Sequence, residues 1–494
     1  MRKTDALFKL IKSLTKTEKR YLTLEARKAG RGESRYWRLY QLINQQLVYD
    51  ETALKKQLKG KLADDKARLY EAILRAMRNY HSQLSQAAQI KEKLLDSSFL
   101  YNRGLYDQAY DRLISARDLA SKLDDQLTGL EVNKEIRRVA NTLFAGQQTE
   151  DLVVLIAEKD QHIEKLEREL KVLDIHDEII REVHAAGSGK KAAKKEALLE
   201  RYGQILLKAE PPASTQGALR YYQSRGLLGS LLADPKMIYE NYVEVLQIWE
   251  QQPTYKREEF TRYLDDASNL FSASLRYAPA RESSLPLLEQ LEAESPASTH
   301  DRRVLFQRTA SARLAYYLNY DNERPAGEVV APIEQGLQQY QLNTVASMVI
   351  RFNAAILFFI QEESEACERW LSDIIQLRRS DVRPDILMAS HLLRATTLFD
   401  QELPFEFFEN QLRTEGRFLQ KQEDAPLKAF GRYWLRSLRK LANVAGRQER
   451  GKLLEEYLQE VEDEWTLLPL GLYELMKAWL RAKLSHKSVV ASLG

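Results

Sequence analysis

The segment HAAGSGKKAAKK, residues 184–195, contains a GSGK core that is similar to a phosphate-binding loop. Such a loop needs the pattern GxxxxGK followed by Ser or Thr, mounted between a buried strand and a helix. His184 stands where the first glycine belongs, and Lys191 replaces the hydroxyl residue that would hold magnesium. The segment also follows a long charged helical stretch instead of a strand. We therefore expect a loop between two helices and no nucleotide site.

The other residues that could carry chemistry form no catalytic or metal-binding pattern. His176 and His184 share a predicted helix, but eight residues at 1.5 Å each place them about 12 Å apart, too far for one metal ion. The remaining histidines show no ligand spacing, and the many paired carboxylates are typical of solvated helix faces. The single cysteine, Cys367, excludes an intrachain disulfide and is interpreted as a packing residue. The sequence thus predicts no enzyme activity, no cofactor and no metal site.

Basic residues concentrate at the N-terminus, where residues 1–82 hold twenty Lys and Arg against nine Asp and Glu. The stretch after residue 15 predicts a helix, a glycine-containing turn and a second helix, as in a DNA-binding helix-turn-helix. The second helix would bury a stripe formed by Trp37, Tyr40, Ile43 and Leu47. Candidate nucleic-acid contacts are Lys16, Arg20, Arg27 and Arg31 for phosphates, and Arg35, Arg38 and Gln41 for base edges. Two alternatives are an ordinary solvated surface on the first helices of a larger array, and a membrane-surface helix at residues 7–14.

A repeated helical pattern extends over the C-terminal part of the chain. Segments that open with a long polar or basic residue start at 220, 262, 313, 351, 391 and 432, and a second amphipathic helix follows each. Two helices per unit of about forty residues predict stacked helical hairpins, which bury their apolar faces only against neighbouring units. All thirteen prolines lie after residue 210, several of them at predicted helix starts, where proline is tolerated.

The first helices of such units line the concave face of the array. The candidate partner-binding residues are therefore Arg220, Tyr221, Arg262, Tyr263, Arg313, Arg351, Arg432 and Tyr433. Arginine and tyrosine are residue types enriched in binding hot spots. Core packing is the alternative role for each aromatic residue.

Residues 99–120, FLYNRGLYDQAYDRLISARDLA, resemble the second half of a tetratricopeptide repeat. Gly104, Tyr106, Ala109 and Ala116 match the spacing of that repeat, and Leu113 replaces its usual aromatic residue. In that pattern the glycine ends one helix, and the small alanines let the paired helices approach closely. The stretch from SLTKTEKRYLTL to NYHSQL, residues 13–84, also resembles a group of uncharacterised bacterial helical-repeat proteins. This second resemblance implies no activity.

Between residues 150 and 186 the sequence predicts one long helix, in which Ile156, Ile163 and Leu170 lie seven residues apart. A coiled coil and a repeat helix packed on its neighbours both fit this spacing, and we favour the repeat helix. No secretory signal and no apolar run long enough to span a membrane occur in the chain. The sequence therefore predicts a cytoplasmic protein.

These patterns together predict an all-α protein, a right-handed superhelical array of antiparallel helical hairpins of the tetratricopeptide-like α-solenoid type. We divide the chain into a basic N-terminal helical region (1–82), tetratricopeptide-like helices with the long helix (83–210), and degenerate hairpin repeats (211–494). The predicted function is a non-enzymatic scaffold or adaptor that binds a protein or peptide on the concave face. The alternative is a nucleic-acid-binding regulator that uses the basic N-terminal helices, with the solenoid as its sensor.

Overall fold

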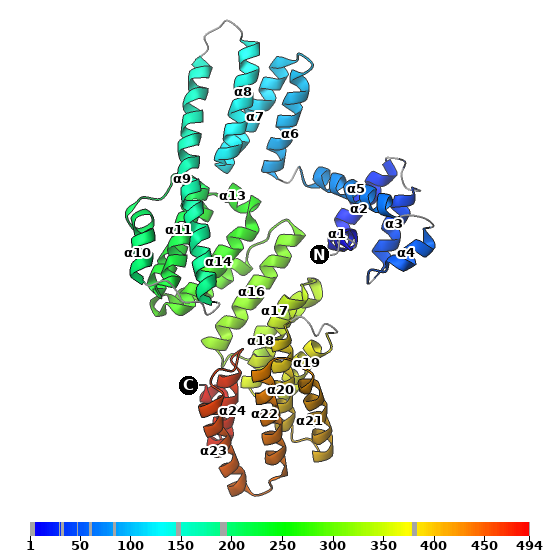
Figure 1. Ribbon diagram of the computed structural model, residues 1–494, viewed down its shortest axis with the longest axis vertical. Helices are drawn as coiled ribbons and strands as arrows, with labels where there is room; N and C mark the ends of the chain where they lie inside the picture. The colour runs from blue at the N-terminus through cyan, green and yellow to red at the C-terminus, as the bar shows by residue number, and fades with distance from the viewer. Residues whose placement is uncertain are drawn as a thin grey trace. The chain divides into compact units, whose positions relative to one another are not determined.

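The computed structural model describes residues 5–28, 30, 34–46, 48–58, 62–82, 85–144, 150–187, 195–377 and 383–493. Within these ranges the chain is all-α, as predicted: it forms helices α1 to α24 and no β-strand (Figure 1). The chain divides into two compact units, Met1–Tyr263 and Leu264–Gly494. The sequence-based boundaries after residues 82 and 210 both fall inside the first unit and stay predictions.

The first unit begins with α1 (Ala6–Ser13), α2 (Lys16–Lys28), α3 (Arg35–Gln45), α4 (Glu51–Gln57) and α5 (Ala63–His81). Helices α2 and α3 both pack against α5, and α1 packs against α3. Trp37, Tyr40 and Ile43 are buried in the core of this group, which confirms three members of the predicted stripe. Leu47, the fourth member, lies outside the described residues.

The next helices are α6 (Gln86–Tyr101), α7 (Tyr106–Leu123), α8 (Gln126–Leu143) and α9 (Glu150–Gly187). Helix α7 packs against α6, α8 against α7, and α9 against α8 (Figure 1). Gly104 has a φ of 76°, a left-handed conformation that favours glycine, and it lies in the turn that ends α6, as the sequence predicts. Ala109, Leu113 and Ala116 of α7 are fully buried, so small side chains do permit close packing here.

The long helix α9 packs against α8 and α11 (Thr215–Leu231), as in the interpretation that we favoured. Its buried apolar residues are Leu155, Val172, Ile175 and Ile179. The predicted heptad residues Ile156, Ile163 and Leu170 are all exposed and lie on a different face. The spacing of seven residues therefore does not mark the packing face of α9.

The rest of the first unit contains α10 (Lys195–Gly203), a π-helical segment (Gln204–Lys208), α12 (Pro235–Gln251), α13 (Pro253–Glu258) and the start of α14 (Phe260–Arg276). Helix α11 packs against both α9 and α12. The backbone N–H and the hydroxyl of Thr215 donate to Asp124 Oδ2 at 2.7 and 2.9 Å. This pair joins the start of α11 to the end of α7.

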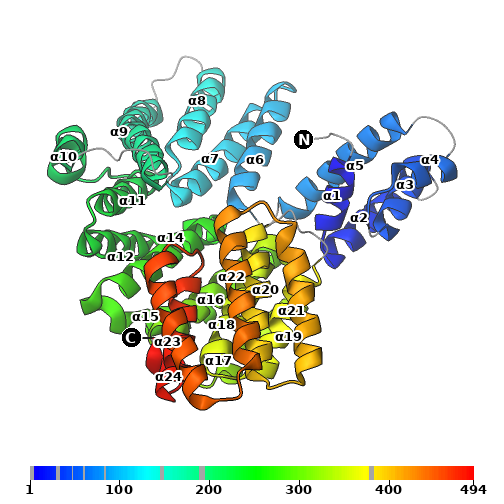
Figure 2. The same ribbon diagram turned by 60° about the horizontal axis from the view of Figure 1, so that its bottom comes forward.

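Among its described residues, the second unit contains the remainder of α14, ten further α-helices and two short 3-10 segments, Ala278–Ser283 and Val490–Ser492. The ten α-helices are α15 (Ser284–Glu292), α16 (Thr299–Asn319), α17 (Ala326–Gln339), α18 (Thr344–Ile360), α19 (Ser364–Ile375), α20 (Pro384–Asp400), α21 (Phe405–Gln420), α22 (Ala425–Asn443), α23 (Arg447–Glu464) and α24 (Leu472–Ser485). Helix α20 is buried on nearly all sides, because α18, α19, α21 and α22 pack around it (Figure 2). Trp434 of α22 donates a hydrogen bond from Nε1 to Thr396 Oγ1 of α20 at 2.8 Å.

Most packing contacts in both units join helices that are neighbours or near neighbours in the chain. The buried residues accordingly form several separate clusters. This arrangement is compatible with a helical-repeat array. Among the described residues, no helix has the length and apolar character that crossing a bilayer requires.

Candidate functional site

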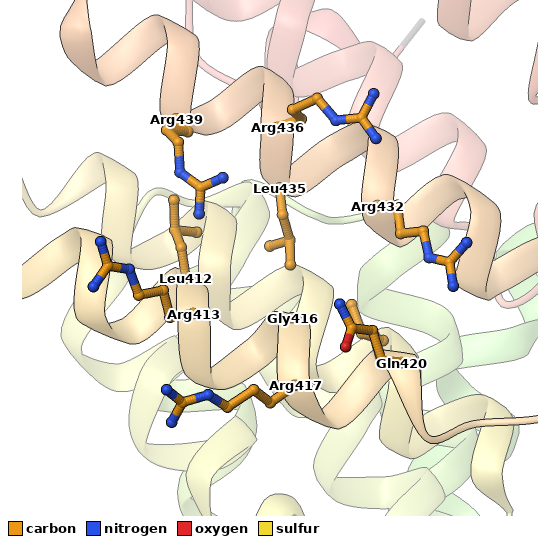
Figure 3. A pocket seen from close by; sticks show the side chains of 10 residues that line it. Leu412, Arg413, Gly416, Arg417, Gln420, Arg432, Leu435, Arg436 and Arg439 are labelled. Atoms are coloured by element: carbon orange, nitrogen blue, oxygen red, sulfur yellow. The ribbon is translucent and has the colours of Figure 1, made fainter.

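The second unit carries a groove of about 370 Å³ between α21 and α22 (Figure 3). We call it the arginine groove. Its lining residues are Leu412, Arg413, Gly416, Arg417, Leu419, Gln420, Arg432, Leu435, Arg436 and Arg439. Five arginines thus surround a floor formed by three leucines and a glycine.

Helical periodicity places these residues on facing sides of the two helices. Arg413, Arg417 and Gln420 of α21 are spaced at i, i+4 and i+7, and Arg432, Arg436 and Arg439 of α22 follow the same spacing. Residues at these intervals share one helix face. The sequence Asp424-Ala-Pro starts α22 sharply: the Asp424 side chain accepts a hydrogen bond from the Leu427 N–H, and Pro426 occupies the first turn.

One carboxylate neutralises part of the groove. Glu409 accepts hydrogen bonds from Arg413 Nε at 3.0 Å and from Arg439 Nε at 2.7 Å. The Arg439 guanidinium, and to a lesser degree that of Arg413, holds the pKa of Glu409 below its usual value. Two of the five arginines are therefore already paired.

Arg417, Arg432 and Arg436 are exposed, and they form no ion pair or hydrogen bond within the described part of the chain. Each guanidinium presents a planar fork of donors that fits a carboxylate or a phosphate. In Figure 3, Leu412 lies between Arg413 and Arg439, and Leu435 lies between Gly416 and Arg436. Leu435 therefore places an apolar side chain beside the free Arg436, a combination that suits a ligand with both carboxylate and apolar groups.

Gly416 has no side chain and therefore leaves space on the floor of the groove. A Cβ at this position would meet Leu435 Cδ1 at 3.8 Å, an ordinary van der Waals contact, so packing does not require glycine here. A glycine inside a helix costs up to about 1 kcal/mol relative to alanine. The residue thus lowers helix stability and leaves space on the floor.

A buried charge cluster orients α21 beneath the groove. Glu415 is 0% exposed; it forms an ion pair with Arg394 and a hydrogen bond with His391, both on α20. Arg394 Nε donates to Glu415 Oε1 at 3.0 Å, and the His391 ring stacks on Phe418 with the ring centres 3.8 Å apart. Because Glu415 faces α20, the neighbouring residues Gly416 and Arg417 face the groove.

Only one of the residues that the sequence singled out for partner binding lines this groove, namely Arg432. Its neighbour Tyr433 points into the unit, where its ring lies 5.8 Å from Trp465 and 6.2 Å from Tyr457. Burial raises the pKa of the Tyr433 hydroxyl, and Glu460 raises it further.

Arg220 and Arg262 come near each other in the first unit, around His176 of α9. Arg220 Nη1 donates to His176 Nε2 at 3.3 Å, and His176 Nδ1 lies 3.1 Å from Ser224 Oγ. Burial, with Arg220 beside the ring, lowers the pKa of His176 to about 4. The imidazole is therefore neutral at pH 7 and accepts a hydrogen bond from Arg220.

The other predicted residues are dispersed. Tyr221 and Tyr263 are 2% and 0% exposed and pack inside the first unit. Arg313 pairs with Glu292 at 2.6 Å, and Arg351 lies 3.9 Å from Asp373. The structure does not bring Arg313 or Arg351 into the arginine groove. The partner-binding role of these residues stays a prediction.

The basic residues of the N-terminal helices are exposed, as a nucleic-acid contact requires: Lys16, Arg20, Arg27, Arg35, Arg38 and Gln41. Arg35 is paired with Asp65 of α5 at 2.6 Å. Arg31 lies outside the described residues. Exposure alone does not test their proposed role.

The remaining candidates are the GSGK segment, the possible metal ligands and Cys367. Residues 188–194 of the GSGK segment lie outside the described residues. Across the described ranges, no group of three or more His, Cys, Asp and Glu side chains is placed to hold a metal ion. Cys367 is buried beside Thr397, as expected of a packing residue, and burial raises the pKa of its thiol to about 12.

The sequence analysis did not identify four arginines of the groove: Arg413, Arg417, Arg436 and Arg439. Their signal was present in RTEGR and RYWLRSLR, where arginines recur at i+4 or i+7 in two successive helices. The fold and the groove together define an all-helical protein with a cationic, partly apolar surface site. The chain matches no family model, and comparisons with curated proteins and with solved structures also give no match.

Proposed function

We propose that this chain is a non-enzymatic interaction scaffold, an array of tetratricopeptide-like helical hairpins, and that it holds an acidic segment of a partner protein in the arginine groove. The observation that carries the proposal is the set of three unpaired arginines, Arg417, Arg432 and Arg436, beside the leucine floor. The single cysteine fits a reducing cytoplasmic compartment.

The energetics support a protein ligand at this site. Neighbouring arginines of like charge repel one another, and carboxylates of a partner would relieve that repulsion while forming bidentate hydrogen bonds. Apolar side chains of the same partner would bury their own apolar surface against the floor, which contributes roughly 25 cal/mol per Å². A small polar anion would gain the first contribution only.

A second candidate function is nucleic-acid binding through the basic N-terminal helices. Lys16, Arg20 and Arg27 favour it, because they lie on one face of α2 and form no ion pair among the described residues. Phosphate contacts from such a face would lose affinity steeply as salt rises.

Two matched triple variants distinguish these functions. One reverses the groove charges through Arg417→Glu, Arg432→Glu and Arg436→Glu, and the other reverses Lys16→Glu, Arg20→Glu and Arg27→Glu. Each replaces three exposed cations by three carboxylates, so the change in net charge is equal. The tagged full chain and both variants are used for affinity purification from the native cell, with and without nuclease.

Protein partners that resist nuclease and disappear only from the groove variant are the expected result. Partners or nucleic acid that disappear only from the N-terminal variant, or on nuclease treatment, would instead establish the second candidate. Equal capture by all three chains would refute both surfaces. Circular dichroism of each variant checks that helix content is unchanged.

A further inference from the structure

We infer that the arginine groove takes an amphipathic acidic α-helix of the partner, about two turns long, with apolar side chains on the floor and carboxylates along both edges. The inference rests on the proposed function, since it specifies the kind of acidic segment that the groove would hold. Four features of the site lead to it: the length, spacing and surroundings of the arginine rows, and the apolar floor.

The length of the site follows from the polar residues that line its two edges. Arg413 to Gln420 on α21 and Arg432 to Arg439 on α22 each span seven residues. At 1.5 Å per residue, both rows are about 10 Å long. A partner helix would therefore present about two turns, with one carboxylate facing Arg417 on the α21 edge and two, at i and i+4, facing Arg432 and Arg436 on the α22 edge.

The spacing between the rows fits a helix, and the need to satisfy backbone hydrogen bonds favours a helix over an extended strand. The axes of packed helices lie about 8–10 Å apart, so the two rows stand on supports separated by that distance. A helix with its side chains is about 10–12 Å across, which is wide enough to reach both rows. A helix also satisfies its own backbone hydrogen bonds, which the leucine floor cannot do for an extended segment.

The apolar floor sets the pattern of the partner. Leu412 and Leu419 are 1% exposed and Leu435 is 6% exposed, and Gly416 leaves room above them. A short apolar side chain over Gly416 would contact this floor. The partner thus needs an apolar stripe between its two acidic edges.

Carboxylates at both ends of the site disfavour a long polyanion such as nucleic acid. Glu406 lies at the start of α21, and Glu423 and Asp424 follow its end. A phosphodiester chain that continued past the arginines would meet these like charges. A short helix ends before it reaches them.

The test measures binding of synthetic peptides to the full chain by fluorescence anisotropy. The first peptide has about sixteen residues, long enough to form a helix when bound, with leucines at i, i+3, i+4 and i+7 flanked by glutamates. A second peptide has the same composition, with its leucines dispersed around the helix. A DNA duplex of similar charge is the third probe.

Three chain variants accompany these probes. Arg417→Gln, Arg432→Gln and Arg436→Gln together remove the free cations. Gly416→Leu fills the floor and retains all five arginines. Gly451→Leu on α23, where a Cβ meets nothing within 4 Å, is the matched control.

The patterned peptide should bind about tenfold or more tightly than the dispersed one, because only its leucines reach the floor together. Its affinity should fall by about tenfold or more in the triple variant and in Gly416→Leu, and should not change in Gly451→Leu. High salt should abolish binding of the dispersed peptide but only weaken binding of the patterned peptide. This difference would indicate an apolar contribution to the affinity of the patterned peptide.

Different results would contradict the helix inference and the proposed function. Equal binding of both peptides, lost in the triple variant but kept in Gly416→Leu, would overturn the helix inference and leave an acidic partner in place. No binding of either peptide would also overturn the helix inference, whereas the purification experiment would still decide the proposed function. Peptide binding that is unchanged in the triple variant would overturn both the helix inference and the proposed function. Tighter binding of the DNA duplex than of the peptides in the groove would also overturn both.

Discussion

Replacing Glu415 by alanine should loosen α21 from α20 and thereby disturb the arginine groove. The carboxylate of Glu415 is 0% exposed, and its partners Arg394 and His391 are 16% and 7% exposed at their side chains. Removal of one partner from a buried pair leaves the other charge without compensation. Such a change costs about 3–5 kcal/mol.

Glu409→Ala in the same helix is the matched control. Glu409 also holds two arginines, but the side chains of Arg413 and Arg439 are 61% and 40% exposed and can be hydrated when the carboxylate is removed. Exposed pairs contribute about 1 kcal/mol or less. Glu415→Gln is a second comparison, because the amide oxygen can still accept a hydrogen bond from Arg394 while the charge is lost. Its cost should lie between those of the two alanine variants.

Hydrogen–deuterium exchange of the full chain, read by mass spectrometry on peptides from α20 and α21, measures this loss locally. A cost of 3–5 kcal/mol corresponds to opening that is roughly a hundredfold or more favourable, since 1.36 kcal/mol is one factor of ten. Peptides from α11 and α12 in the first unit serve as the internal reference and should keep their rates.

An increase of less than about tenfold in α20 and α21 for Glu415→Ala would show that the buried pair does not hold the two helices together. Equal effects of Glu415→Ala and Glu409→Ala would refute the argument from burial. In either case the orientation of the groove would need another explanation.

Two further predictions concern glycine packing and pH. Gly416→Ala should stabilise the second unit by up to about 1 kcal/mol. Gly336→Ala should instead destabilise it by about 1–3 kcal/mol, because the added Cβ would clash with the Phe306 ring. Urea unfolding midpoints that move in the same direction for both variants would contradict this contrast. The pKa of His176 is lowered to about 4 in the folded chain, whereas an unfolded histidine takes up its proton near pH 6.5. The first unit should therefore keep its full stability above about pH 6.5. As the pH falls to 5, its free energy of unfolding should decrease by about 2 kcal/mol. The His176→Gln variant should not show this loss. If unfolding curves at pH 7 and pH 5 differ equally for the unmodified chain and the variant, His176 is not the cause.

Helical periodicity and local turn chemistry were sufficient to predict much of the fold. The stripe of Trp37, Tyr40 and Ile43 is buried, and Gly104 ends α6 in a left-handed turn. Both features depend on residues within one or two helical turns of each other. Cys367 is likewise buried, in line with its small apolar side chain. The all-α class follows from the same local patterns.

The arginine groove could be predicted only in part. The spacing of arginines within α21 and within α22 is visible in the sequence, and Arg432 was singled out there. The adjacency of the two rows was not visible, because it depends on how α21 and α22 rotate when both pack on α20. The Glu415 pair with Arg394 and His391 contributes to that rotation, and it joins residues 21 and 24 positions apart.

The sequence by itself determined the helices, their ends and the types of residue that each face carries, because these are governed by contacts within a few turns of the chain. Where a helix carries apolar residues on more than one face, tertiary structure alone decided which face became core and which became surface. Tyr221 and Tyr263 follow candidate arginines and are buried, while Ile156, Ile163 and Leu170 form a regular apolar row and are exposed. The physical reason is that a helix buries the face its neighbours cover, and the neighbours are positioned by packing between helices that local sequence does not encode.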